Sequence, residues 1–110
     1  MELHLDLDDI VVRLLNAEDM SRFQVNVDKP LGANPVSHGH RLGDVVAARH
    51  VGVLEDSGLV AVDPAILRFL AAGEVGETWE SDLAAMIAGA TEHGWVDDEG
   101  RVRGHVVWPS

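Results

Sequence analysis

The sequence predicts an α+β fold in which two or three helices pack on a small, mainly antiparallel sheet, with a C-terminal helix followed by a β-hairpin. Apolar residues recur at helical spacing in two segments, 64–72 and 78–93. Apolar and polar residues alternate in short segments near both termini, which is typical of strands with one buried face. A length of 110 residues with 46% hydrophobic residues suffices for one core, so we expect a single globular domain over 1–110.

The first third of the chain predicts two strands. Three leucines alternate with polar residues in LHLDLD at 3–8, which favours a strand. The alternative is an extended lead-in to a helix that is capped by Asp8 or Asp9 and carries the apolar residues of 10–15. FQVNV at 23–27 predicts a further strand, and the proline, glycine and asparagine residues of 30–37 predict a loop.

The middle segment, HVGVLEDSGLVAV at 50–62, fits two alternatives. In one, a helix that includes LGDVVAAR at 42–49 continues to a stop at Gly58, and a strand follows. In the other, two short strands form a hairpin that turns at 55–58. The density of valine and the presence of Gly52 favour strands, whereas the spacing of apolar residues from Leu42 to Leu54 also fits one face of a helix. The pattern leaves both alternatives open.

A helix over 64–72 is indicated by its start signal. Asp63 can accept hydrogen bonds from the first free amides, and Pro64 suits the first helical position. We expect Ile66, Phe69 and Leu70 to face the same way, toward the core.

A second helix follows Thr78, which can cap it, and ends at Gly94, which can adopt the left-handed conformation. Its apolar stripe and the tryptophan after it predict core positions at Leu83, Met86, Ile87 and Trp95. Beyond an acidic turn, residues 102–108 alternate as a strand, which completes the predicted hairpin.

The charge balance excludes several classes of partner. Nineteen acidic residues against eight basic ones give a net charge of −11, which repels nucleic acid and anionic membrane surfaces. The absence of cysteine excludes disulfides and thiolate metal sites, and it fits a reducing cytoplasm. The N-terminal segment carries acids where a secretory signal has Lys or Arg, so we expect a cytoplasmic protein. A single lysine, Lys29, against seven arginines suggests a GC-rich bacterial genome.

The densest group of metal-ligating side chains is SHGHRLGDVVAARH at 37–50. On a strand, His38 and His40 would project to the same side, and His50 or Asp44 could supply a third ligand. Three imidazoles would leave an open position for water on zinc or another divalent cation. The alternative is a solvated loop that carries His38 and His40, followed by a core histidine at position 50.

Three hypotheses for function follow. The first is a small acidic protein-interaction or regulatory module without enzymatic activity or cofactor, which binds a protein partner or forms a homo-oligomer. The second is a small metal-dependent or acid–base enzyme, or a small-ligand binder, centred on His38, His40 and His50. The third is an immunity protein or antitoxin-like acidic binder, for which a basic protein is the expected partner.

Overall fold

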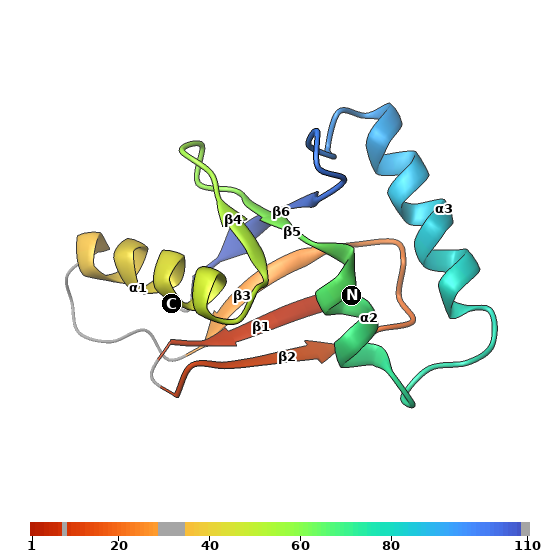
Figure 1. The fold of residues 1–110 in the computed structure, drawn as a ribbon, viewed down its shortest axis with the longest axis horizontal. Coiled ribbons are helices and arrows are strands. Elements are labelled where there is room, and N and C mark those ends of the chain that lie inside the picture. The colour runs from red at the N-terminus through yellow and green to blue at the C-terminus, as the bar shows by residue number, and fades with distance from the viewer. Residues whose placement is uncertain (8, 29–34, 109–110) are drawn as a thin grey trace.

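A computed structural model describes residues 1–7, 9–28 and 35–108, and the side chains of 35–41 lie outside the described part (Figure 1). In chain order the elements are β1 (Glu2–Asp6), β2 (Val11–Leu15), β3 (Gln24–Asp28), α1 (Pro35–Ala48), β4 (Gly52–Leu54), β5 (Val60–Val62), α2 (Pro64–Ala71), α3 (Trp79–Glu92) and β6 (Val102–Val107). The three helices lie on one mixed sheet, which confirms the predicted α+β class. Among the described residues, no helix is long and apolar enough to cross a membrane.

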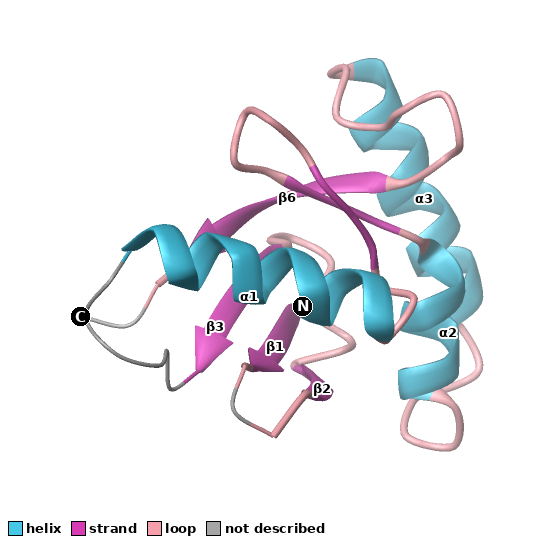
Figure 2. Cartoon of the chain, turned by 60° about the vertical axis from the view of Figure 1, so that its left-hand side comes forward, coloured by secondary structure: helices cyan, strands magenta, loops and turns pink. Residues whose placement is uncertain are grey.

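The sheet has the strand order β2-β1-β3-β6-β5-β4. The β1–β2, β4–β5 and β5–β6 pairs are antiparallel, whereas β1–β3 and β3–β6 are parallel. A parallel neighbour needs a crossover connection, and the chain makes the β3-to-β6 crossover through all three helices. In Figure 2, α1 lies across the strands, while α2 and α3 stand together at one end of the sheet.

The core lies on one face of the sheet. Leu3 and Leu5 of β1, and Leu7 just after it, are fully buried, and they belong to the same cluster as buried residues of β3, β5 and the helices. The helices contribute Leu42, Val45 and Val46 of α1, Leu67 and Ala71 of α2, and Trp79 and Leu83 of α3. Burial of one leucine side chain contributes about 1.5–3 kcal/mol, so this shared face dominates the stability of the fold.

Two hairpins resolve the alternatives left open by the sequence. Residues after β1 turn back into β2, with Leu3 opposite Leu14 and Leu5 opposite Val12, so the helix proposed for 10–15 is wrong. The segment 50–62 is the β4–β5 hairpin, and the amide of Gly58 donates to the carbonyl of Glu55 within its turn. The β-branched residues therefore follow their strand propensity.

The helix ends agree with the predicted signals in part. Asp63 caps α2, because its carboxylate accepts a hydrogen bond from the Ala65 amide at 2.9 Å. Gly94 follows α3 with a φ of 76°, as predicted. Thr78 makes no capping hydrogen bond, and its hydroxyl donates instead to the Asp82 carboxylate. The predicted loop at 30–37 is replaced from Pro35 onward by α1, and 29–34 lie outside the described residues.

The predicted core needs correction at its outer positions. Leu83 is fully buried, Met86 and Ile87 are half-buried against the core, and Trp95 is 38% exposed. Trp95 follows the end of α3 at the rim of the helical layer, so its large ring is only partly covered. Leu67 and Ala71, rather than Phe69, are the fully buried positions of α2.

We expect substitution of Gly52 by alanine to destabilise the fold strongly. A Cβ at this position would lie 1.8 Å from the carbonyl oxygen of Ala61, so β4 and β5 could not keep their spacing. We expect a loss of about 3 kcal/mol or more in the free energy of unfolding, measured by urea denaturation. Gly89→Ala in α3 is the matched control. Nothing lies within 4 Å of its added Cβ, so a neutral or stabilising effect is expected. Equal effects of the two substitutions would contradict the packing at Gly52.

Candidate functional site

Two histidines of the predicted metal site lie in a different secondary structure from the one expected. His38 and His40 lie in helix α1, so they are on neither the strand nor the solvated loop considered for them. Their side chains lie outside the described residues. Among the side chains that the structure describes, no group of three or more His, Asp or Glu residues is placed to hold a metal ion. The metal site of His38, His40 and His50 therefore stays a prediction.

His50 lies two residues beyond the end of α1 and is exposed, so it is not the core histidine expected from a continuing helix. Its φ of 54° ends the helical path, and the next residue, Val51, returns to the core with no exposed surface. The helix face that would have buried an imidazole at position 50 ends with Val46.

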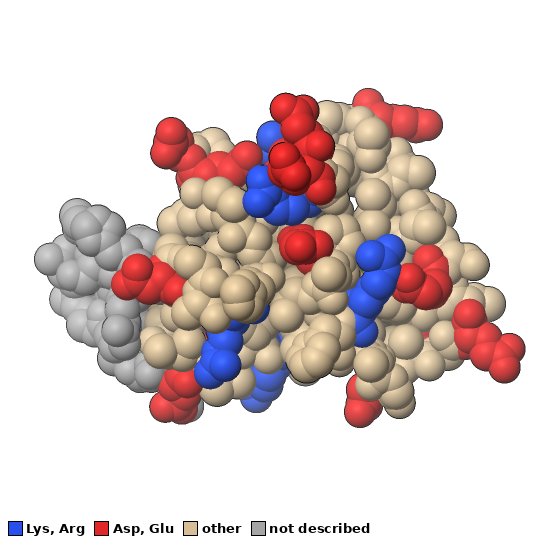
Figure 3. Space-filling view, in the orientation of Figure 1, with Lys and Arg blue, Asp and Glu red and all other residues tan. Residues whose placement is uncertain are grey.

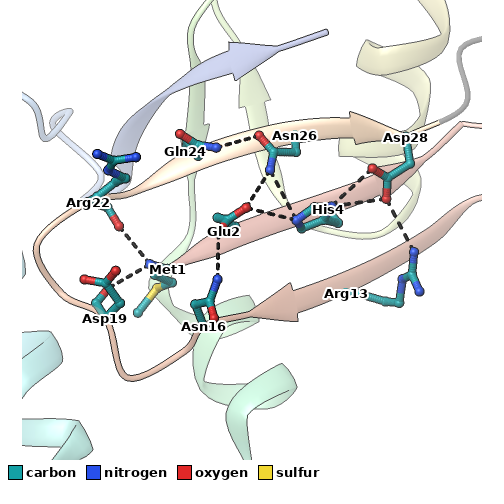
Figure 4. A network of polar contacts seen from close by, with 10 residues as sticks. All are labelled: Met1, Glu2, His4, Arg13, Asn16, Asp19, Arg22, Gln24, Asn26 and Asp28. Atoms are coloured by element: carbon teal, nitrogen blue, oxygen red, sulfur yellow. Dashed lines mark hydrogen bonds and ion pairs between the residues drawn. The ribbon is translucent and has the colours of Figure 1, made fainter. Parts of the chain in front are cut away.

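Strands β1, β2 and β3 carry a polar network on the sheet face opposite the core (Figure 4). The Nδ1 atom of His4 lies 3.1 Å from the Asp28 carboxylate, and its Nε2 atom lies 3.2 Å from the Asn26 amide and 3.4 Å from the Glu2 carboxylate. Arg13 adds an ion pair to Asp28. The described side chains that contact His4 supply two carboxylates and an amide, and no hydroxyl nucleophile is among them.

Within this network, hydrogen bonds lower the pKa of the Glu2 carboxyl. The Asn16 amide donates to Glu2 at 2.7 Å, and this bond, with those from His4 and Asn26, holds the pKa of the Glu2 carboxyl below its ordinary value. Both nitrogens of His4 are already within hydrogen-bonding distance of neighbours. The arrangement links three strands on the sheet face opposite the core, and this cross-strand pairing stabilises the sheet.

A second site lies where the end of α1, strand β2 and α2 meet. A hollow of about 410 Å³ is lined here by Ile10, Val11, Val12, Ala48, Arg49, His50, Ile66, Phe69 and Leu70. We call it the Phe69 groove. The Phe69 side chain is 76% exposed, the largest exposed fraction among the exposed large hydrophobic residues described, and Val11 and Ile10 are 41% and 36% exposed. Large apolar side chains that gather on a surface in this way mark contact sites.

Arg49 supplies a positive charge to the lining of the Phe69 groove and His50 an imidazole, and no carboxylate is among the described lining residues. Figure 3 shows basic side chains at the upper centre, the lower centre and right of centre of this face, with acidic side chains around them on all sides. The groove therefore combines an apolar floor with a basic rim in a chain of net charge −11.

The turn before β2 is held in an unusual conformation at the groove. Ile10 has a φ of 55°, which is sterically unfavourable for a β-branched residue and costs about 1–2 kcal/mol. The Arg49 guanidinium donates to the carbonyl oxygen of Ile10 at 2.7 Å, so the end of α1 anchors this turn. Strained backbone of this kind is often retained at functional sites.

The sequence pattern does not reveal this groove, because its residues are far apart in the chain. The apolar spacing in 64–72 predicts Phe69 on the buried side of its helix, and this prediction is wrong. The spacing of apolar residues within α2 could have indicated that Phe69 is exposed. Leu67 and Ala71, four residues apart, define a buried stripe, and Phe69 lies about 200° around the helix from Leu67.

Comparisons with known protein families, curated proteins and solved structures found no match for this chain. The assignment of function therefore depends on the geometry above.

We expect Asn16→Gly to reduce the pH dependence of stability. Glycine tolerates the φ of 51° at this position but removes the hydrogen bond to Glu2. Because the pKa of Glu2 is lower in the folded than in the unfolded chain, its stabilising contribution is present above the unfolded pKa, about 4.3, and is lost as the pH falls through the folded pKa. The difference in unfolding free energy between parent and variant should thus shrink on acidification, measured by urea denaturation at several pH values. A difference that is independent of pH would contradict this linkage.

We expect zinc to leave the melting temperature of the parent and of a His38→Ala, His40→Ala double variant unchanged within a few degrees. A metal that binds only the folded state raises stability by RT ln(1 + [L]/Kd), so a thermal melt with and without zinc detects it. A stoichiometric metal in the purified, untagged parent that is lost in the double variant would instead support the enzyme hypothesis.

Proposed function

We propose that this chain is a protein-interaction module that binds a partner protein through the Phe69 groove. The observation that carries the proposal is the 76% exposure of Phe69 beside the exposed Val11 and Ile10. Contact of an apolar phenylalanine ring with water is unfavourable. Burial of the ring against a partner removes this contact and supplies a large interface area. As predicted from the sequence, we take the module to be a single domain of a cytoplasmic bacterial protein.

The rim of the groove supports a partner segment of defined chemistry. Arg49 and His50 favour carboxylates that flank an apolar side chain, and the floor accepts that side chain next to Phe69. The net charge of −11 repels acidic molecules that lack the apolar anchor. A basic groove within an acidic surface attracts the matching acidic segment, while the rest of the surface repels other acidic molecules. This arrangement favours specific over unspecific binding.

Strand β2 supports an extended conformation for that segment. It lies at the end of the strand order and pairs with β1 on one side. An edge strand presents backbone amides and carbonyls along its outer side, and an extended peptide can pair with them. Val11 and Leu15, which are 41% and 46% exposed, would lie beside alternate residues of the added strand.

Peptide display tests the proposal and defines the chemistry of the bound segment at the same time. Random peptides are selected on the immobilised protein, and the enriched sequences are synthesised and titrated by calorimetry. We expect them to share an apolar or aromatic residue flanked by Asp or Glu. Phe69→Ser should weaken their binding by at least about tenfold, and Arg49→Gln by less.

Two controls keep this experiment decisive. Val53→Ser changes an exposed apolar residue, 41% exposed like Val11 of the groove, on the opposite edge strand β4, and it should leave the affinity unchanged. Phe69→Ser should lower the unfolding free energy by less than about 1 kcal/mol, because the side chain is mostly exposed. Failure to enrich a peptide family, or equal binding by the Phe69 variant, would overturn the proposal. A dimer of the parent that dissociates on Phe69→Ser would assign the groove to a second copy instead.

A further inference from the structure

On a different part of the molecule, a hollow of about 370 Å³ lies between the 20–23 turn, α3 and β6. We call it the Trp95 pocket. Its apolar wall includes Met20, Phe23, Met86 and Trp95, and the first three are partly buried against the core. The Trp95 ring meets the ring of His105 edge-on, with 5.2 Å between centroids. The volume is at the lower end of the range of small-molecule sites, about 300–1,000 Å³.

Two arginines line this pocket, and they differ in their partners. The Arg103 guanidinium is neutralised by the Glu55 carboxylate at 2.9 Å. Arg22 is exposed, and in the described part of the chain its guanidinium has no hydrogen bond or ion pair, while Arg13, Arg49, Arg68, Arg101 and Arg103 each have one. Figure 4 shows the Arg22 side chain pointing away from the polar network, toward β6.

The position of Arg22 is fixed by its backbone. The Met1 nitrogen donates to the carbonyl oxygens of Asp19 at 2.7 Å and Arg22 at 2.8 Å, and the Asp19 amide donates to Asn16. Trp95 is fixed in a similar way, since its amide donates to Ala90 of α3 and its carbonyl accepts from the Arg103 amide of β6. A site on well-held backbone binds a ligand with little loss of conformational entropy.

We propose that the Trp95 pocket binds a small monocarboxylic acid with an apolar body, whose carboxylate pairs with Arg22. The apolar wall fits the hydrocarbon part of the ligand, and the planar guanidinium fits a carboxylate in two parallel hydrogen bonds. The indole N–H of Trp95 has no partner among the described residues, so it is a second donor for the ligand. No carboxylate is among the described residues that line the pocket, and the nearby Asp19 carboxylate interacts with Arg22 electrostatically without an ion pair among the described contacts.

Correlation NMR of the tryptophan indole groups tests this site. Octanoate and phenylacetate are the anionic probes, and octanamide is the neutral probe matched to octanoate. We expect octanoate to shift the Trp95 indole signal in a saturable way, with little change at Trp79 or Trp108. Octanamide should bind at least about tenfold more weakly, since it lacks the charge that pairs with Arg22. The relative affinities of octanoate and phenylacetate show whether a chain or a ring fills the pocket.

Three variants separate charge recognition from apolar contact. Arg22→Gln should weaken octanoate by about tenfold and leave octanamide unchanged, whereas Arg68→Gln, an exposed arginine on α2, should change neither. Ala90→Leu adds bulk to the wall of the pocket and should abolish binding of both probes. Equal affinity for octanoate and octanamide, octanoate binding that survives Arg22→Gln, or the absence of a saturable Trp95 shift would overturn the proposal. None of these outcomes involves Phe69, so they leave the proposed protein interface untouched.

Discussion

The alternation of leucine with polar residues along β1 is the constraint on which the rest of the structure depends. Strand β1 lies between β2 and β3, so its leucines form the centre of the core face. Its other face presents Glu2 and His4 to the network with β3 and β2. A shift of the strand register by one residue would bring these charged groups into the core. One face of the sheet therefore packs against the helices, and the other forms polar cross-strand contacts.

This one-sided arrangement decides which helix residues remain exposed. Helix α2 is short, and it turns Leu67 and Ala71 toward the core while Asp63 fixes its start. Phe69 is then left outside, next to the β1–β2 turn that Arg49 anchors. The Phe69 groove is thus a consequence of how the helical layer meets the edge of the sheet, and its exposed aromatic ring is what a partner would bury.

Local signals in the sequence predicted much of the fold and little of the candidate site. The alternation in β1, the Asp63–Pro64 pair and Gly94 act within a few residues, so their structural outcome can be read directly from the sequence. The parallel pairings of β3 could not be predicted, because they depend on where the helices carry the chain. The same limit applies to the groove, in which Arg49 and Ile10 meet across 39 positions of sequence.

The two phenylalanines of the chain allow the exposure of Phe69, and its burial by a partner, to be measured directly. With para-fluorophenylalanine incorporated at Phe23 and Phe69, fluorine NMR in light and heavy water reports the solvent contact of each ring. We expect a large solvent isotope shift for Phe69 and a smaller one for the half-buried Phe23. Addition of a selected acidic–apolar peptide should then reduce the shift of Phe69 and leave that of Phe23 unchanged. A Phe69 ring that is protected in the free monomer, or that stays fully exposed in the peptide complex, would show that the Phe69 groove is not a binding surface.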